Sequence, residues 1–139
     1  MKKSYIVFAL LLGITVYSQT INIPNANFKN TLVNTICVDN NGDIYPDTDA
    51  DTNNNGEIEV SEALAVIVMN VNARSLTDVT GLEEFTNLQV LFCEQNSITQ
   101  LPLSTLQDLE LLYCRDNSLN SLDLSNPVNL MDFGCDQNQ

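Results

Sequence analysis

The sequence of 139 residues contains no histidine and no tryptophan, and only five of its residues are lysine or arginine. Without histidine, the chain has neither Cys/His zinc sites nor nucleophiles that depend on a histidine base. Two of the basic residues lie in the first three positions, so the rest of the chain carries three basic residues against 18 acidic ones, a net charge of −15. Because such a surface repels phosphate, nucleic acid and anionic membranes are poor partners.

Long hydrophobic stretches are also scarce, and the longest one covers residues 5–16. This run is shorter than the roughly 20 apolar residues that span a bilayer. Two lysines precede it and Val16 and Ser18 suit the small-residue positions after it, a pattern typical of a secretory signal peptide at residues 1–18. A membrane anchor is the alternative. We expect a mature chain that starts near Gln19, is secreted or at the cell surface, has no transmembrane segment and forms one domain.

The C-terminal half repeats with a period of 21 residues, because LQVLFCEQNSI at 88–98, LELLYCRDNSL at 109–119 and LMDFGCDQN at 130–138 align without a gap. Apolar residues, a cysteine and an asparagine recur at fixed positions of this frame. They are Leu88, Leu91, Cys93, Asn96 and Ile98, then Leu109, Leu112, Cys114, Asn117 and Leu119, then Leu130, Phe133, Cys135 and Asn138. A degenerate copy at 66–76 starts 22 residues earlier and has Arg74 in place of the asparagine.

This frame resembles the leucine-rich repeat, with cysteine at a position often held by leucine. The resemblance covers residues 66–139 and implies an α/β solenoid in which each coil contributes one short parallel strand. The alternation around Leu91 and Cys93 independently predicts a strand with one buried face. Each repeat asparagine is expected to bond backbone groups of the turn that leaves the strand. The connecting segments predict turns or short 3₁₀ pieces on the convex side.

Three of the four cysteines, Cys93, Cys114 and Cys135, share one position of the frame. We expect an inward column of free thiols, each replacing a small hydrophobic side chain. Disulfides are the alternative, since adjacent strands lie about 4.8 Å apart, but side chains of equal orientation are poorly aimed for the disulfide torsion. Cys37 lies outside the repeats, and its redox state is open.

Upstream of the repeats, IPNANFKNTLVNTIC at residues 23–37 predicts a helix of about three turns. A Pro-Asn pair provides the start signal, and Phe28, Leu32 and Ile36 form one apolar stripe. The end coil of a solenoid exposes a core-sized apolar face, so this helix is expected to cap the first coil. The sequence thus predicts an N-terminal cap at residues 19–65, followed by repeats at 66–139.

The stretch DTNNNGEIEVSE at residues 51–62 resembles the calcium-binding loop of the EF-hand. The resemblance implies as ligands the side chains of Asp51, Asn53, Asn55, Glu59 and Glu62 and the backbone carbonyl of Glu57. Oxygen atoms at alternate positions converge on a hard cation, and Gly56 permits the sharp turn. A solvated acidic loop without an ion is the alternative. Two ligands are neutral amides, so we expect a structural Ca²⁺ site with a Kd of about 10⁻⁵ to 10⁻³ M.

The preceding stretch, VDNNGDIYPDTDAD, is also acidic. Oxygen-bearing side chains recur in it at calcium-like intervals, at Asp39, Asn41, Asp43, Asp47 and Asp49, without completing a frame. A second ion and a disordered acidic loop are both open for this stretch.

The exposed face of the predicted sheet carries three columns of alternate strand residues. They are Val68, Val90, Leu111 and Asp132, then Asn70, Phe92, Tyr113 and Gly134, then Asn72, Glu94, Arg115 and Asp136. Val90, Phe92, Leu111 and Tyr113 make an apolar patch, which predicts a binding site for a protein or cell-surface ligand. Cross-strand stacking that only supports the sheet is the alternative. The third column alternates in sign and predicts a charge ladder worth little energy.

No nucleophile with a base, phosphate-binding glycine loop or carboxylate pair in an apolar cleft is predicted, so we expect no enzymatic activity. The signal segment, helix, acidic loop and repeats together look like the N-terminal region of exported bacterial leucine-rich repeat proteins. We predict an adhesion or recognition module with a structural calcium site. A passive spacer of a larger exported protein and a calcium-dependent hydrolase fragment are the alternatives. The chain ends inside a repeat, so we expect it to be part of a longer protein.

Overall fold

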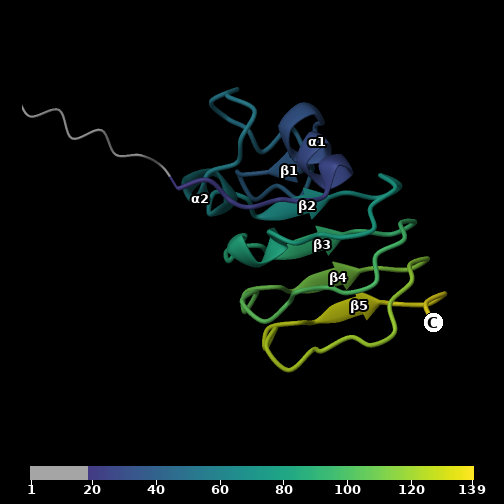
Figure 1. The fold of residues 1–139 in the computed structure, drawn as a ribbon. Coiled ribbons are helices and arrows are strands. Elements are labelled where there is room, and N and C mark those ends of the chain that lie inside the picture. Colours follow the sequence, from purple (N-terminus) through teal and green to yellow (C-terminus); the bar gives the residue numbers. More distant parts are fainter. Residues whose placement is uncertain (1–18) are drawn as a thin grey trace, which may run out of the picture.

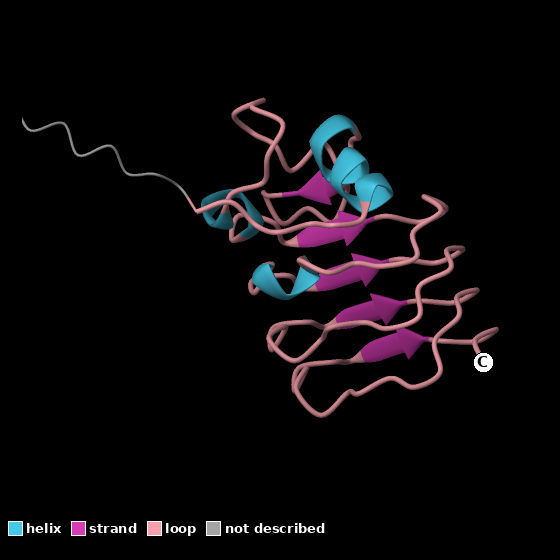
Figure 2. Ribbon diagram, viewed as in Figure 1, coloured by secondary structure: helices cyan, strands magenta, loops and turns pink. Residues whose placement is uncertain are grey.

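A five-stranded sheet with its strands in sequence order runs through residues 19–139, which are the residues that the computed structural model describes (Figure 1). The strands are β1 (Val38–Asp39), β2 (Val68–Asn70), β3 (Val90–Phe92), β4 (Leu111–Tyr113) and β5 (Asp132–Gly134). β2 to β5 pair in parallel, each from one coil. Figure 2 shows the return segments stacked beside them. The short parallel strands of the predicted solenoid are confirmed. The predicted signal segment lies outside the described residues.

The strand register follows the repeat frame. Each strand residue lies beside the residue at the same frame position in the next coil, as in the pairs Leu91–Leu112 and Phe92–Tyr113. Leu91 and Leu112 are 1% and 0% exposed and belong to one continuous core. Phe133 holds the same frame position in β5 but is 50% exposed, because β5 has a neighbouring strand on one side only. Stacking therefore buries the apolar face of each coil against the next.

The repeat asparagines bond the backbone as predicted. Asn117 donates from Nδ2 to the carbonyl oxygens of Cys93 at 2.9 Å and Cys114 at 3.1 Å. Its Oδ1 accepts a hydrogen bond from Ile98 N at 3.0 Å. The asparagines of the two flanking coils make equivalent bonds. Each asparagine thus ties its own coil to the preceding one and satisfies backbone groups that would otherwise be buried unpaired.

A left-handed residue follows the strand in each coil. These residues are Ala73, Gln95, Asp116 and Gln137, with φ between 54° and 58°. The αL conformation turns the chain out of the sheet at the same frame position each time. On the return side, the 3₁₀ helix η1 (Leu82–Glu84) precedes β3, and turns connect β3 to β4. Turns and one short 3₁₀ piece agree with the sequence prediction.

The helix α1 (Ala26–Asn34) lies at the β1 end of the sheet (Figure 1). Asn25 caps it, because its side chain accepts a hydrogen bond from Phe28 N at 2.9 Å. Phe28 and Leu32 are fully buried in the core. The prediction that Ile36 continues this stripe was wrong, since Ile36 is 66% exposed. The helix ends before Ile36, and the chain becomes extended in order to enter β1. No helix of residues 19–139 is long and apolar enough to cross a membrane.

β1 was not predicted from the sequence. This strand pairs antiparallel with β2, which places Asp39 opposite Val68. The Asp39 side chain is fully buried, and its carboxylate accepts hydrogen bonds of 2.7 to 3.1 Å from three backbone amides of the following loop. The start of the acidic stretch, residues 41–44, therefore folds around a buried carboxylate. The second ion remains a prediction.

The four cysteines are free thiols. Cys93 and Cys114 are buried in the column that the repeat predicts, and Cys135 is exposed. Burial raises the pKa of Cys37 to about 12 and that of Cys114 to about 11, and it raises the pKa of Cys93 further still. The three buried thiols are therefore protonated at neutral pH and act as small apolar side chains.

Candidate functional site

The acidic loop at residues 51–62 ends in the short helix α2 (Val60–Ala63), which leads into β2. Asp51 is 2% exposed. Its two carboxylate oxygens accept hydrogen bonds from Asn55 N at 3.0 Å and Gly56 N at 2.7 Å. Gly56 has a φ of +83°, in the left-handed region that suits glycine. The loop is thus wrapped around the Asp51 carboxylate, with the sharp turn at the predicted residue.

Glu59 and Glu62 are each 6% exposed and form a capping box at the start of α2. Glu62 Oε2 accepts from Glu59 N at 3.0 Å, and Glu62 Oε1 accepts from Thr52 Oγ1 at 2.9 Å. The amides of Asn53 and Asn55 donate to the Glu59 carboxylate at 2.9 and 2.8 Å. The pKa of Glu59 is lowered, first by its side-chain hydrogen bond with Glu62 and then by the one from Asn55. These four predicted ligands therefore lie in one hydrogen-bonded cluster.

The oxygen atoms of these side chains are of the kind that a hard cation takes as ligands. The three buried carboxylates of the loop, Asp51, Glu59 and Glu62, make hydrogen bonds but take part in none of the ion pairs of residues 19–139. Uncompensated buried charge is unfavourable, and Ca²⁺ takes oxygen ligands. Within the described residues, no three acidic, cysteine or histidine side chains converge closely enough to hold a metal ion by themselves. An ion here therefore also needs the amide oxygens of Asn53 and Asn55 and the carbonyl oxygen of Glu57.

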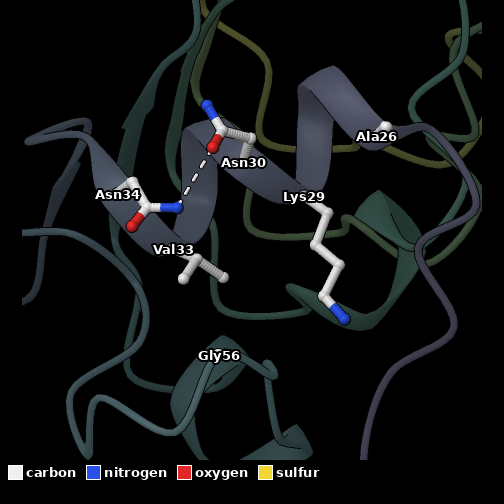
Figure 3. Close-up of a pocket in the computed structure, with 6 residues that line it drawn as sticks. All are labelled: Ala26, Lys29, Asn30, Val33, Asn34 and Gly56. Atoms are coloured by element: carbon white, nitrogen blue, oxygen red, sulfur yellow. Dashed lines mark hydrogen bonds between the residues drawn. The ribbon is translucent and has the colours of Figure 1, made fainter.

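An open groove of about 430 Å³ lies between α1 and the acidic loop (Figure 3). Its walls are formed by Ala26, Lys29, Asn30, Val33, Asn34 and Gly56. In Figure 3 the Val33 side chain points from the helix toward Gly56. Lys29 Nζ pairs with Glu57 Oε2 at 2.7 Å, which ties the helix to the loop. The groove offers apolar contact but no nucleophile paired with a base, so it shows no catalytic arrangement.

The exposed face of the sheet presents the predicted aromatic pair. The rings of Phe92 and Tyr113 are stacked, with centroids 5.7 Å apart and planes inclined by 13°. Both residues and Leu111 beside them are half-buried. Val90 is only 5% exposed, and Val68 in the same column is fully buried. The accessible part of the predicted patch therefore consists of Phe92, Leu111 and Tyr113, with Val90 as support beneath it.

Arg115 extends this stack, an arrangement that was not predicted from the sequence. Its guanidinium carbon lies 5.3 Å from the centroid of the Tyr113 ring. A Cβ atom at Gly134, the register partner of Tyr113, would meet Arg115 Nε at 2.7 Å. The arginine thus fills the space that a side chain of β5 would occupy, and Tyr113 lies between Phe92 and Arg115. The sequence signal for this arrangement was Gly134, a glycine in the column that otherwise holds Asn70, Phe92 and Tyr113.

Charged groups border the aromatic pair on both sides. Arg115 lies 3.1 Å from Asp136 and 3.9 Å from Glu94, as the alternating third column predicted. On the other side, the Tyr113 hydroxyl donates a hydrogen bond of 2.5 Å to Asp132 Oδ2. This hydrogen bond is the main reason that the pKa of Tyr113 is raised. The patch is therefore an aromatic centre flanked by three carboxylates and one guanidinium group.

Comparisons with known proteins found solved structures with a similar fold. No protein-family model matches the chain, and no curated protein matches it in sequence. The structure is similar to the functional domain of InlJ from Listeria monocytogenes, which includes a cysteine ladder, with a TM-score of 0.65 and 27% identity over 88% of this chain. It is also similar to the internalin InlF from Listeria monocytogenes, with a TM-score of 0.64 and 22% identity over 90% of this chain. The chain covers 24% and 34% of those two chains. Together with the parallel sheet and its repeat register, this likeness supports a bacterial leucine-rich repeat fold of the α/β class.

Proposed function

We propose that the chain is a recognition module, secreted or at the cell surface, that binds a protein or peptide on the exposed face of its sheet. The observation that carries the proposal is the stacked Phe92–Tyr113 pair, which stays partly accessible on a rigid sheet. Aromatic side chains on such scaffolds supply much of the energy at protein interfaces. The likeness to internalins supports an adhesion module rather than an enzyme. The signal-like residues 1–18 support export.

Replacing Phe92 and Tyr113 together by serine tests this function. We expect the double variant to lose at least about tenfold in affinity, because the accessible apolar centre of the interface is removed. Peptides are selected from a random dodecapeptide display library on the immobilised native protein. The Kd of each selected peptide is then measured for the native protein and for the double variant.

The matched control is the pair Ile44→Ser and Tyr45→Ser. These side chains are 58% and 72% exposed, and they belong to the loop after β1 rather than to the predicted patch. The control variant is expected to bind every selected peptide with native affinity and to unfold at the native denaturant midpoint. The Phe92/Tyr113 variant loses a half-buried stacked pair, so its midpoint should fall, and its binding is measured in the absence of denaturant, where it should stay folded. If no selected peptide distinguishes the native protein from the Phe92/Tyr113 variant, the aromatic stack only supports the sheet and a passive spacer becomes the better description.

We further propose that one Ca²⁺ ion binds in the loop at residues 51–62 and stabilises the N-terminal cap. The ligands would be the side chains of Asp51, Asn53, Asn55, Glu59 and Glu62 and the carbonyl of Glu57. The support is the cluster of buried carboxylates that lack ion pairs. A bound ion supplies the missing positive charge. The cap itself is α1, which buries Phe28 and Leu32 at the β1 end of the solenoid.

Calcium is expected to raise the free energy of unfolding. With a Kd between about 10⁻⁵ and 10⁻³ M, about 2 mM Ca²⁺ adds about 0.6 to 3 kcal/mol to the native protein by mass action. Glu62→Gln should abolish this increment, because it removes the charge while keeping an oxygen that accepts hydrogen bonds. Urea unfolding with Ca²⁺ and with a chelator measures the difference for each protein.

Glu57→Gln is the control for the calcium experiment. It makes the same chemical change in the same loop, but the Glu57 side chain is exposed and pairs with Lys29. The calcium increment should survive in this variant. An unfolding free energy of the native protein that is the same with Ca²⁺ and with chelator would rule out the ion site.

A further inference from the structure

Both faces of the Tyr113 ring, and the face of Phe92 that meets it, are already used inside the protein. Phe92 and Tyr113 cover one another, and Arg115 lies over Tyr113. A ligand therefore cannot stack flat on Tyr113, and it meets the ring edges and Leu111 instead. Such a surface suits an aliphatic side chain, or an aromatic one that packs against the ring edges, rather than a planar group that must stack flat on Tyr113.

The charges around this centre are mostly negative. Asp132 lies in the column before Tyr113, and Glu94 and Asp136 lie in the column after it. The positive charge of Arg115 is already shared between Glu94 and Asp136 and is held against Tyr113. Three carboxylates against one neutralised guanidinium leave an acidic border on both sides of the apolar centre.

The remaining basic residues of the described chain do not reduce this charge. Lys29 belongs to α1 and pairs with Glu57. Arg74 belongs to the turn after β2, between the left-handed residues Ala73 and Ser75. A second copy of the same chain would present the same acidic border and would be repelled, and so would a polyanion. Charge complementarity therefore selects a basic partner.

We propose that the exposed face binds an extended basic segment of a partner polypeptide, with one apolar side chain on Phe92, Leu111 and Tyr113 and a lysine or arginine on either side of it. This inference rests on the proposed recognition function and adds the chemistry of the partner. The column that holds Asp132 and the column that holds Glu94 and Asp136 are four residues apart along the strands, which corresponds to about 13 Å at about 3.3 Å per residue. An extended segment that follows the strand direction matches this spacing with basic residues four positions apart and the apolar residue midway.

The test uses the peptides whose binding depends on the aromatic pair. Among these peptides, the pattern basic, any, apolar, any, basic should be enriched over its acidic counterpart. The double variant Glu94→Gln and Asp132→Asn should weaken their binding about tenfold at low salt, because two exposed charge pairs are lost. Both substitutions are isosteric and keep an oxygen for the hydrogen bonds from Asn72 and Tyr113. The effect should shrink in about 0.5 M NaCl, where charges are screened over a few ångströms.

A variant with the same loss of charge elsewhere controls for general attraction to an acidic protein. Glu84→Gln and Asp108→Asn change two exposed acids of the return segments and should leave the Kd within about twofold of the native value. Equal weakening by both double variants would overturn the assignment to this face, as would aromatic-dependent peptides without flanking basic residues. Either result leaves the recognition function standing, whereas a complete lack of aromatic-dependent peptides overturns both proposals.

Discussion

Asn117→Ala is expected to lower the free energy of unfolding by about 2 to 4 kcal/mol, since buried backbone groups lose their partners. Ile98 N loses the Oδ1 acceptor at 3.0 Å, and the carbonyl oxygens of Cys93 and Cys114 each lose one donor. Asn117 is only 9% exposed, so water cannot fully replace these bonds. Urea unfolding should show a lower midpoint with an unchanged m-value, because the surface exposed on unfolding stays the same.

Asn138→Ala provides the matched comparison. Asn138 makes the same bonds one coil later, to Cys114 O at 3.0 Å and from Leu119 N at 3.0 Å, but at the edge of the sheet where solvent reaches them. Its replacement should cost about 1 kcal/mol or less, because water substitutes for the lost partner. Equal losses for Asn117 and Asn138 would show that desolvation of the backbone is not the cause.

Gly81→Ala is expected to destabilise the protein by about 2 to 4 kcal/mol through strain and steric overlap. Gly81 has a φ of +102°, which an L side chain rarely adopts. Its added Cβ would lie 2.9 Å from Ile23 Cγ1 and 3.1 Å from Asn22 O, where the N-terminal segment crosses the return segment of the first coil. A backbone oxygen cannot move aside as a flexible side chain can, so the crossing segment must shift.

Gly42→Ala separates backbone strain from steric overlap. Gly42 has a similar φ of +85°, but a Cβ there would make only an ordinary contact of 3.8 Å with Ile67 Cδ1. This variant should lose about 1 kcal/mol from backbone strain alone. The difference between the two variants in denaturant unfolding measures the overlap at the crossing. A Gly81 variant no less stable than the Gly42 variant would mean that residues 21–23 are not held against the first coil.

The acidic loop shows which features of a site a sequence motif predicts and which it does not. Residue types and spacing identified its turn at Gly56 and the cluster of oxygen-bearing side chains, because both depend on a short local segment. They did not show that Glu62 closes a capping box with Glu59, or that Asn53 and Asn55 donate to Glu59. Those bonds depend on where α2 begins and on which donors remain unpaired after the loop folds.

The exposed face of the sheet likewise has features that the sequence predicted and features that it did not. The repeat frame by itself determined that Phe92 and Tyr113 would be neighbours, because equal frame positions of successive parallel strands must pair. It did not determine that Val68 and Val90 would be buried, or that Arg115 would fill the space beside Gly134. Both outcomes depend on which volumes are left open once the strands are packed.

The sequence by itself determined the repeating part of this protein, namely the strand register, the inward columns and the asparagine bonds between coils. A solenoid coil contacts mainly its nearest neighbours, so one 21-residue pattern contains nearly all of its interactions. Only the tertiary structure decided the rest. The pairing of β1 with β2 and the crossing of residues 21–23 at Gly81 join segments that are distant in the chain, and the early end of α1 before Ile36 goes with the entry into β1. Such contacts occur once, and their packing depends on the whole assembled end of the solenoid.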